Sequence, residues 1–266
     1  MAKELKVLVA GALGKMGRET VRAVKTSDDL VLAGAVDVKA RNKIISDITG
    51  DEHDRDAIWP DLEAALESLK VDVVVDFTNP QAVFNNARTV LRHGIPCVVG
   101  TTGLNEREIK ELERLACDNQ TGIAIIPNFA IGAVLMMRFA EEASRYFADV
   151  EIVELHHENK LDAPSGTAIK TAEMIEHNRQ GTPLAPRGQF EKYPGVRGGQ
   201  VNGVRVHSVR LPGLVAHQEV LFGGQGQTLS IRHDSYNRES FMPGVILTIQ
   251  KIVNTRGLVY GLEHLI

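Results

Sequence analysis

The sequence predicts an α/β protein with a doubly wound parallel sheet in its N-terminal half and an α+β domain on a mostly antiparallel sheet in its second half. Three observations support this fold class. Short, continuous apolar runs alternate with helical patterns in the first half, which is typical of a parallel sheet covered on both faces. A glycine-rich turn follows the first of these runs. Later runs of strand character are separated by Pro-Gly and Gly-Gly turn signals.

Length and composition limit the class of protein. A chain of 266 residues with 43% hydrophobic content can bury the cores of two domains, which we place at 1–128 plus 238–266 and at 129–237. The formal charge of −4 offers no basic excess for nucleic acid. No apolar leader and no run long enough to cross a bilayer is present, so we expect a cytoplasmic protein without a membrane partner. Two cysteines are too few for a disulfide framework or a thiolate metal cage, and no metal site is predicted.

The first strand, turn and helix indicate a dinucleotide site of the Rossmann type. The apolar run 5–10 leads into glycines 11, 14 and 17, and a helical pattern continues through Val24. Glycine allows a tight turn and close approach of the backbone to a pyrophosphate, whose charge is stabilised by the helix N-terminus. A glycine pattern is weak evidence alone. The next strand, 30–36, ends in Asp37, placed to accept hydrogen bonds from a ribose.

Three more buried strands are expected at 71–77, 95–99 and 123–126, separated by helices at 80–93 and 105–119. Their carboxyl ends carry Asp76 to Thr78, then Gly100 to Thr102, then Pro127 to Phe129. Each end could be an ordinary helix cap or turn. Because all of them fall on the same edge as the glycine turn, a shared cofactor cleft explains them better.

The second half is expected to contain an antiparallel meander of strands at 204–211, 217–222 and 227–233. The stretch 182–203, with Arg187 and Arg197, is interpreted either as a lid or as a disordered excursion. Histidines 207, 217 and 233 are interpreted as structural. A helix at 243–253 is followed by an apolar tail, 257–262, which we expect to pack on the first domain.

The run 154–168 is the most informative stretch for chemistry, because it brings two imidazoles, an ammonium and a helix start together. Pro164 ends the preceding segment, and Ser165 can cap the helix that follows. The amides of Gly166 and Thr167 are then oriented to stabilise an anion, with Lys160 nearby. The pattern suits an acidic substrate.

A capped surface helix after a polar loop is the simpler interpretation of this run, and the capping pattern alone would favour it. His156, His157 and Lys160 shift the balance toward a site. If the strand 150–155 continues through both histidines, their side chains point to opposite faces, so only one can face a given ligand atom.

With these residues in place, the chain closely resembles the dihydrodipicolinate reductase family over essentially its whole length. The resemblance rests on 9–17, 75–78, 100–103, 128–129 and, above all, on 156–168. It implies reduction of 4-hydroxy-tetrahydrodipicolinate, a cyclic dicarboxylate, to tetrahydrodipicolinate with NADH or NADPH, in the diaminopimelate route to lysine. It also implies a homotetramer formed through the sheet of the second domain.

The resemblance further implies residue roles. His156 and Lys160 are the expected catalytic residues, and the expected substrate-binding residues are His157, Ser165, Gly166 and Thr167. An imidazole that titrates near neutrality suits proton donation after hydride addition. The expected cofactor-binding residues are Gly11, Ala12, Leu13, Gly14, Lys15, Met16, Asp37, Gly100, Thr101, Thr102, Ile126, Pro127, Asn128 and Phe129.

One position departs from the pattern that many relatives of this family have. They place an arginine after the acid to hold the 2′-phosphate of NADPH, whereas Val38 follows Asp37 here. Lys15, Lys39 or Arg41 could compensate, but a lysine is a point charge rather than a planar fork. We therefore predict that NADH is used at least as well as NADPH.

Two alternative functions are considered. Another nicotinamide-dependent dehydrogenase of amino-acid metabolism, such as one acting on a semialdehyde, would use a cysteine nucleophile, but Cys97 lies inside an apolar run. A dinucleotide sensor that has lost the reaction would have a broken proton-transfer set, yet His156 and Lys160 are both present.

Overall fold

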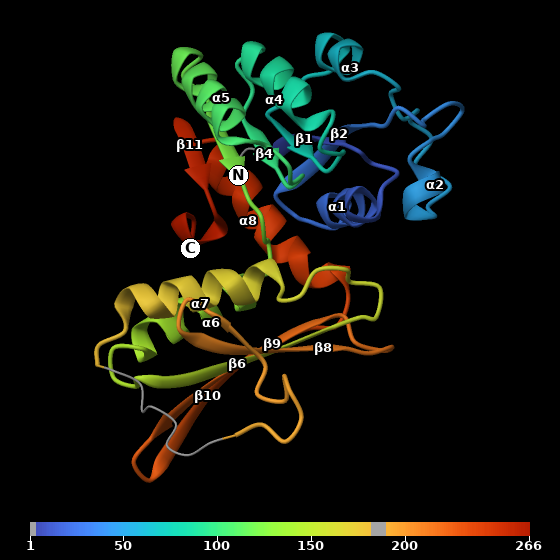
Figure 1. The fold of residues 1–266 in the computed structure, drawn as a ribbon. Coiled ribbons are helices and arrows are strands. Elements are labelled where there is room, and N and C mark those ends of the chain that lie inside the picture. The colour runs from blue at the N-terminus through green and yellow to red at the C-terminus, as the bar shows by residue number, and fades with distance from the viewer. Residues whose placement is uncertain (1–3, 182–189) are drawn as a thin grey trace. The chain divides into compact units, whose positions relative to one another are not determined.

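The computed structural model describes residues 4–181 and 190–266. The expected lid or excursion therefore lies partly outside the described residues, and so does Arg187. The chain divides into two compact units, Met1–Phe129 with Phe241–Ile266, and Ala130–Ser240 (Figure 1). The first unit thus contains both ends of the chain.

The first unit is built on a six-stranded sheet in the order β11-β5-β4-β3-β1-β2, with every pair parallel. This confirms the predicted doubly wound sheet. The apolar tail forms its sixth strand, because β11 pairs with β5. The strands are β1 (Leu5–Ala10), β2 (Leu30–Val36), β3 (Val73–Asp76), β4 (Cys97–Val99), β5 (Gly122–Ile125) and β11 (Gly257–Tyr260).

Helices cover both faces of this sheet, with α4 and α5 on one side and α1 and α8 on the other (Figure 1). Three consecutive residues of β3, Val73, Val74 and Val75, are therefore all fully buried, which explains why its run is continuously apolar. The helices of this unit are α1 (Lys15–Lys25), α2 (Ser46–Thr49), α3 (Leu62–Ser68), α4 (Val83–Arg92), α5 (Glu106–Asp118) and α8 (Met242–Ile252).

Two helices begin where local capping chemistry starts them. Asn105 and Glu108 form a reciprocal capping box at the start of α5. The helix predicted from residue 80 instead begins at Val83, because the Asn79 side chain accepts hydrogen bonds from the amides of Gln81 and Ala82 and forms a turn there. The chain also forms two 3-10 helices, η1 (Arg238–Phe241) and η2 (Leu262–His264).

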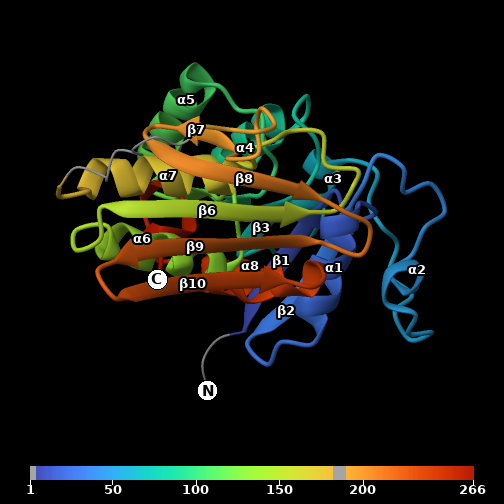
Figure 2. The same cartoon turned by 60° about the horizontal axis from the view of Figure 1, so that its bottom comes forward.

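The second unit is built on a five-stranded sheet in the order β10-β9-β6-β8-β7, with helices behind it (Figure 2). Only the β6 and β8 pair is parallel, so the predicted mostly antiparallel sheet is confirmed. The elements are α6 (Ile131–Ala143), β6 (Asp149–His156), α7 (Gly166–Asn178), β7 (Gly199–Val201), β8 (Val204–Arg210), β9 (Ala216–Gly224) and β10 (Gln227–Ser235).

Two details of the predicted second domain were wrong. The three later strands do not form a meander, because β6 lies between β8 and β9 and pairs with both. Ile152 of β6 sits opposite Val206 and Val220, so the apolar strand takes the central position. The end of the predicted loop also forms β7, which joins β8 through Asn202 and Gly203, both at positive φ. Asn-Gly is a strong two-residue hairpin signal.

Within the part of the chain that the structure describes, no helix is both long and apolar enough to span a membrane.

The third glycine of the turn is required by packing. A Cβ on Gly17 would lie 2.1 Å from the Gly11 carbonyl oxygen and 2.8 Å from the Ala12 Cα, both backbone atoms. We expect Gly17→Ala to lower the free energy of unfolding by roughly 1–3 kcal/mol, the typical effect of overpacking. Thermal and urea unfolding measure this. Gly199→Ala is the matched control, since open space surrounds that position; equal unfolding midpoints for the two variants would contradict the packing argument.

Candidate active site

The glycine turn is held tightly between two strand ends. Gly11 has φ +78°, and a Cβ there would lie 2.5 Å from the Phe77 carbonyl oxygen, so no side chain fits. The amides of Gly11 and Ala12 both donate to the Val36 carbonyl at the end of β2. The turn is therefore fixed with its backbone at the carboxyl edge of the sheet, where ligands of parallel sheets bind.

Helix α1 starts at this turn without a side-chain cap. Gly14 is its N-cap, and no side chain among the described residues caps the helix start. The Gly14 amide donates to the Gly11 carbonyl, which tightens the turn. An uncapped helix start presents N–H donors and the positive end of the macrodipole, a combination that stabilises a phosphate.

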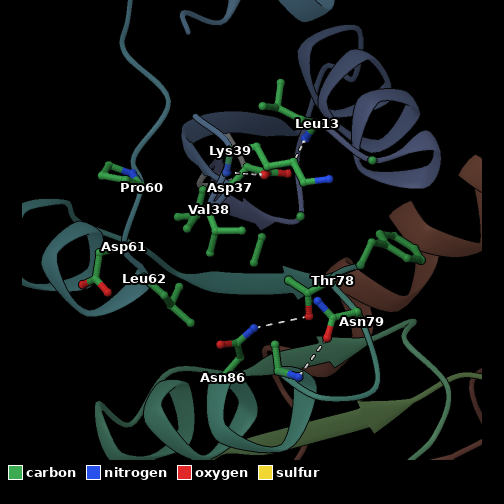
Figure 3. Close-up of a pocket in the computed structure, with 16 residues that line it drawn as sticks. Leu13, Asp37, Val38, Lys39, Pro60, Asp61, Leu62, Thr78, Asn79 and Asn86 are labelled. Atoms are coloured by element: carbon green, nitrogen blue, oxygen red, sulfur yellow. Dashed lines mark hydrogen bonds between the residues drawn. The ribbon is translucent and has the colours of Figure 1, made fainter. Parts of the chain in front are cut away.

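Asp37 links the turn to the end of β2. Its carboxylate accepts hydrogen bonds from the amides of Leu13 (3.0 Å) and Lys39 (2.9 Å) (Figure 3). A carboxylate has about four acceptor positions. Two therefore remain for the hydroxyls of a ribose, so the residue fits the role predicted for it.

A cavity of about 340 Å³ opens beside these groups (Figure 3). Four of the predicted cofactor residues line it, together with a segment that the sequence did not indicate. That segment, Pro60 to Leu62, reaches the site because Trp59 bridges to Val36 at the end of β2. The lining residues are Ala10, Gly11, Leu13, Gly14, Val36, Asp37, Val38, Lys39, Pro60, Asp61, Leu62, Phe77, Thr78, Asn79, Ala82 and Asn86.

Asp76 organises the neighbouring strand ends. The residue is 1% exposed, and its carboxylate accepts from the Thr78 amide and hydroxyl, from Asn86 Nδ2 (2.8 Å) and from Thr101 Oγ1 (2.9 Å). The predicted Thr101 is thereby fixed beside the pocket residue Thr78. A buried carboxylate with four donors is fully satisfied, and it joins the residues after β3 and β4 to helix α4.

Phe77 continues this edge toward β4 and β5. A Cβ on Gly100 would lie 2.1 Å from the Phe77 ring, and the Phe77 and Phe129 rings are 5.5 Å apart. The ends of β3, β4 and β5 thus meet at one edge. The predicted residues Ala12, Thr102, Ile126, Pro127 and Asn128 belong to the same strand ends and turns, and Lys15 and Met16 begin α1. These residues do not line the cavity of Figure 3.

In the second unit, His156 is the last residue of β6 and lies over a buried acid. His156 Nδ1 is 2.5 Å from Glu154 Oε2, and Glu154 is 0% exposed. Arg210, opposite His156 on β8, donates from Nη1 to Glu154 Oε2 (2.9 Å) and from Nη2 to Oε1 (2.8 Å). Burial by itself raises the pKa of the Glu154 carboxyl. The hydrogen bonds from His156 and Arg210 outweigh this effect and lower the pKa from its ordinary value of 4.5 to about 2.

The loop after His156 carries the predicted ammonium. Lys160 Nζ donates to both Asp162 carboxylate oxygens, at 2.8 and 2.9 Å, and the hydrogen bond from Lys160 lowers the pKa of Asp162. Arg210 Nη2 also donates to the Asp162 carbonyl (2.8 Å). Hydrogen bonds therefore connect His156 to the loop that carries Lys160. His157 lies beyond the end of β6 and is exposed.

Helix α7 begins as predicted. Ser165 is its N-cap and is 3% exposed, and its hydroxyl accepts from the Ala168 amide at 3.2 Å. Gly166 is exposed, and a Cβ added there would meet open space. The helix start is thus open on the side of Gly166, as an anion site requires.

The other strand histidines have structural partners. His207 Nε2 is 2.7 Å from a Glu151 carboxylate oxygen, His217 Nδ1 is 2.7 Å from Asp234, and the His233 ring packs on Gly132 of α6. Across residues 4–181 and 190–266, no three His, Cys, Asp or Glu side chains gather in a way that could hold a metal ion.

Sequence reasoning missed several of these residues. Glu154 could have been found, because positions two apart in a strand share a face and a carboxylate under His156 needs a partner. Arg210 had no such signal, since the parallel register of β6 and β8 is not visible in the sequence. Asp76 was visible at the end of its strand, but its partner Asn86 was not, because their contact depends on how α4 packs.

Comparison with known proteins covers the whole chain. Residues 5–129 match the family model described as dihydrodipicolinate reductase, N-terminus, and residues 132–266 match dihydrodipicolinate reductase, C-terminus. A 4-hydroxy-tetrahydrodipicolinate reductase of Syntrophomonas wolfei is 59% identical over 266 residues, all of both chains. One of Bacillus cereus is 48% identical over 264 residues, 99% of both chains.

A solved structure agrees with these relatives. The dipicolinate-bound dihydrodipicolinate reductase of Paenisporosarcina sp. TG-14 superimposes with a TM-score of 0.89 at 42% identity, covering 99% of this chain and 100% of that one.

The depressed pKa of Glu154 predicts a specific loss of stability in acid. The folded carboxyl has a pKa of about 2 against an ordinary value of 4.5, so its contribution is fully present above about pH 4.5 and is lost as pH falls toward about 2. We expect the difference in unfolding free energy between the wild type and Glu154→Gln to shrink over this window, because the variant lacks the titrating group. Urea unfolding followed by circular dichroism measures it. A difference that stays constant with pH would contradict the prediction.

Proposed function

Because this chain belongs to the dihydrodipicolinate reductase family, we propose that it is a 4-hydroxy-tetrahydrodipicolinate reductase that uses a nicotinamide cofactor. The observation that carries the proposal is the joint presence of an uncapped glycine-turn helix beside Asp37 in the first unit and of a buried-acid–imidazole pair at the end of β6 in the second. The first unit is assigned to the dinucleotide and the second to the substrate.

The first unit fits a dinucleotide on its own geometry. Gly11 admits no side chain, Gly14 leaves the α1 start uncapped, and Asp37 retains acceptor positions for a ribose. We assign the predicted residues at the ends of β3, β4 and β5 to the remainder of the cofactor. When bound, a reduced nicotinamide supplies the hydride; the residues of this unit bind and orient it.

The second unit supplies the proton and the anion contacts. His156 is assigned the proton that completes the reduction, since an imidazole can donate near neutral pH. Lys160 is assigned to a substrate carboxylate and to the second proton donation. His157, Ser165, Gly166 and Thr167 are assigned to substrate binding at the α7 start. A relative solved with dipicolinate, a cyclic dicarboxylate, supports this substrate class.

The alternative of a cysteine-dependent dehydrogenase is disfavoured by the thiol itself. Cys97 is 1% exposed, and burial together with the Asp76 carboxylate raises its pKa. A buried neutral thiol is a poor nucleophile. The reduction proposed above needs no cysteine.

We also propose that the chain assembles as a homotetramer through the second sheet. Helices α6 and α7 cover one face of this sheet (Figure 2). The strands leave apolar side chains such as Leu221, which is 38% exposed, available for contact with another copy.

Loss of the proton donor tests the function. We expect His156→Ala to lower kcat by roughly 10²- to 10⁴-fold, the usual contribution of a general acid, and Lys160→Ala to lower kcat/KM. Turnover is assayed with freshly generated 4-hydroxy-tetrahydrodipicolinate, and cofactor binding by calorimetry. His207→Ala is the control, because His207 pairs with Glu151 away from the site. Wild-type protein that binds cofactor without turnover would instead indicate a sensor.

The position after Asp37 tests cofactor preference. Val38 is 84% exposed and lines the cavity, and Lys39 is the only cation among the described lining residues. We expect the wild type to use NADH at least as well as NADPH. Val38→Arg should raise kcat/KM for NADPH relative to NADH by about tenfold or more, because a guanidinium binds phosphate in a bidentate manner. Val38→Gln is the uncharged control. A large NADPH preference in the wild type would contradict the prediction.

A further inference from the structure

We propose that Glu154 is a positioning residue that fixes the His156 ring with Nδ1 toward the interior, so that Nε2 is the nitrogen that exchanges the proton with substrate. The inference rests on the proposed function, because it assigns a role to Glu154 only through His156. It explains why a fully buried acid lies directly under the imidazole.

The geometry allows little freedom. Glu154 and His156 are two residues apart on β6, so they share one face of the strand. Glu154 is 0% exposed, and its Oε2 is 2.5 Å from His156 Nδ1. Water cannot replace the carboxylate at a site closed to solvent. The hydrogen bond to Glu154 therefore fixes the ring orientation.

Arg210 fixes the state of the acid. Both Glu154 oxygens accept from the Arg210 guanidinium, at 2.8 and 2.9 Å, so the carboxylate is paired and cannot rotate away from the ring. The same contacts keep the Glu154 pKa low, at about 2. An ionised carboxylate only accepts hydrogen bonds. His156 must therefore carry a hydrogen on Nδ1 and donate it in a hydrogen bond to Glu154.

Two consequences follow for the imidazole. Its neutral form is the Nδ1–H tautomer, which leaves Nε2 without hydrogen and able to take up a proton. Its protonated form donates from Nε2 and keeps the Nδ1 hydrogen bond to Glu154. The acid of a serine-protease triad acts on its histidine in the same way. Arg210 also contacts the Asp162 carbonyl, so the same guanidinium supports the Lys160 loop.

A purely structural role is the competing explanation. The Glu154–Arg210 pair joins β6 to β8, and its only purpose could be to hold that register. The two explanations differ in one respect: a structural pair acts on turnover whether or not position 156 is a histidine, whereas a positioning residue acts only through His156.

Glu154→Gln separates them. In the wild type Glu154 Oε2 accepts from both His156 Nδ1 and Arg210 Nη1, whereas the amide of the variant has one acceptor oxygen for these donors and for Arg210 Nη2, so the variant no longer fixes the Nδ1–H tautomer. We expect kcat to fall about 100-fold or more, with the KM for cofactor little changed. In a His156→Ala background the same substitution should cause no further loss, as a double-mutant cycle reveals. Equal losses in both backgrounds would overturn the proposal.

The same strand offers a matched control. Glu151 of β6 also accepts hydrogen bonds from a histidine, His207, and from an arginine, Arg197, but it lies three residues away from Glu154. Glu151→Gln therefore removes the same kind of group from the same strand. We expect it to retain wild-type kcat.

Nitrogen-15 NMR of the histidine rings gives a readout that does not depend on activity. At a pH where His156 is neutral, the wild type should give the Nδ1–H tautomer and Glu154→Gln a larger share of the Nε2–H tautomer, with the His156→Ala spectrum assigning the signal. An Nε2–H tautomer in the wild type would overturn the proposal. If the wild type lacks reductase turnover, the proposed function fails, and this spectrum still decides whether Glu154 fixes the His156 tautomer.

A double variant tests the proposal if Glu154→Gln alone does not fold. If Glu154→Gln fails to fold because it leaves Arg210 unpaired, Glu154→Gln combined with Arg210→Met removes both charges. We expect this double variant to fold, to bind cofactor and to retain the low kcat. Recovery of wild-type kcat in it would overturn the proposal.

Discussion

A carboxylate that is buried away from water must accept hydrogen bonds from protein donors, and this requirement shapes the candidate site in each unit. In the first unit, Asp76 collects Thr78, Asn86 and Thr101 and so fixes the ends of β3 and β4. In the second, Glu154 collects His156 and Arg210. Removing one donor from such a group leaves a charge unsatisfied, so each network behaves as a unit rather than as separate contacts.

The edge of the first sheet that carries the glycine turn adds a second constraint, because backbone atoms approach one another closely there. Gly11 and Gly17 are needed because carbonyl oxygens occupy the space where side chains would be. The same closeness places the uncapped start of α1 beside the Asp37 carboxylate. The positive end of α1 and the negative Asp37 carboxylate are therefore neighbours. A ligand that carries both a phosphate and a ribose complements this pair.

The sequence predicted well whatever depends on local pattern. Strand β2 has the predicted limits, Ser165 caps α7, and the tail at 257–262 returns to the first unit as β11. The predictions from sequence failed where the pairing of strands that are distant in the chain determines the fold. The insertion of β6 between β8 and β9 replaced the expected meander, and Arg210 was hidden until that register was known. The β7–β8 hairpin is different, because Asn202-Gly203 was a visible signal that the Gly- and Arg-rich context obscured.

The Lys160–Asp162 pair has a consequence for ligand selection. Asp162 is largely exposed, and exposed ion pairs contribute only ~0–1 kcal/mol, so an arriving carboxylate can displace it readily. Lys160 would then exchange the Asp162 carboxylate for that of the ligand, so the net gain in electrostatic attraction would be small. A molecule with a single acidic group would gain almost nothing there. Under the proposed function, a second acidic group held elsewhere in the same unit would supply the discrimination, and the spacing between two charges on the ligand, rather than either charge alone, would be the property that is selected.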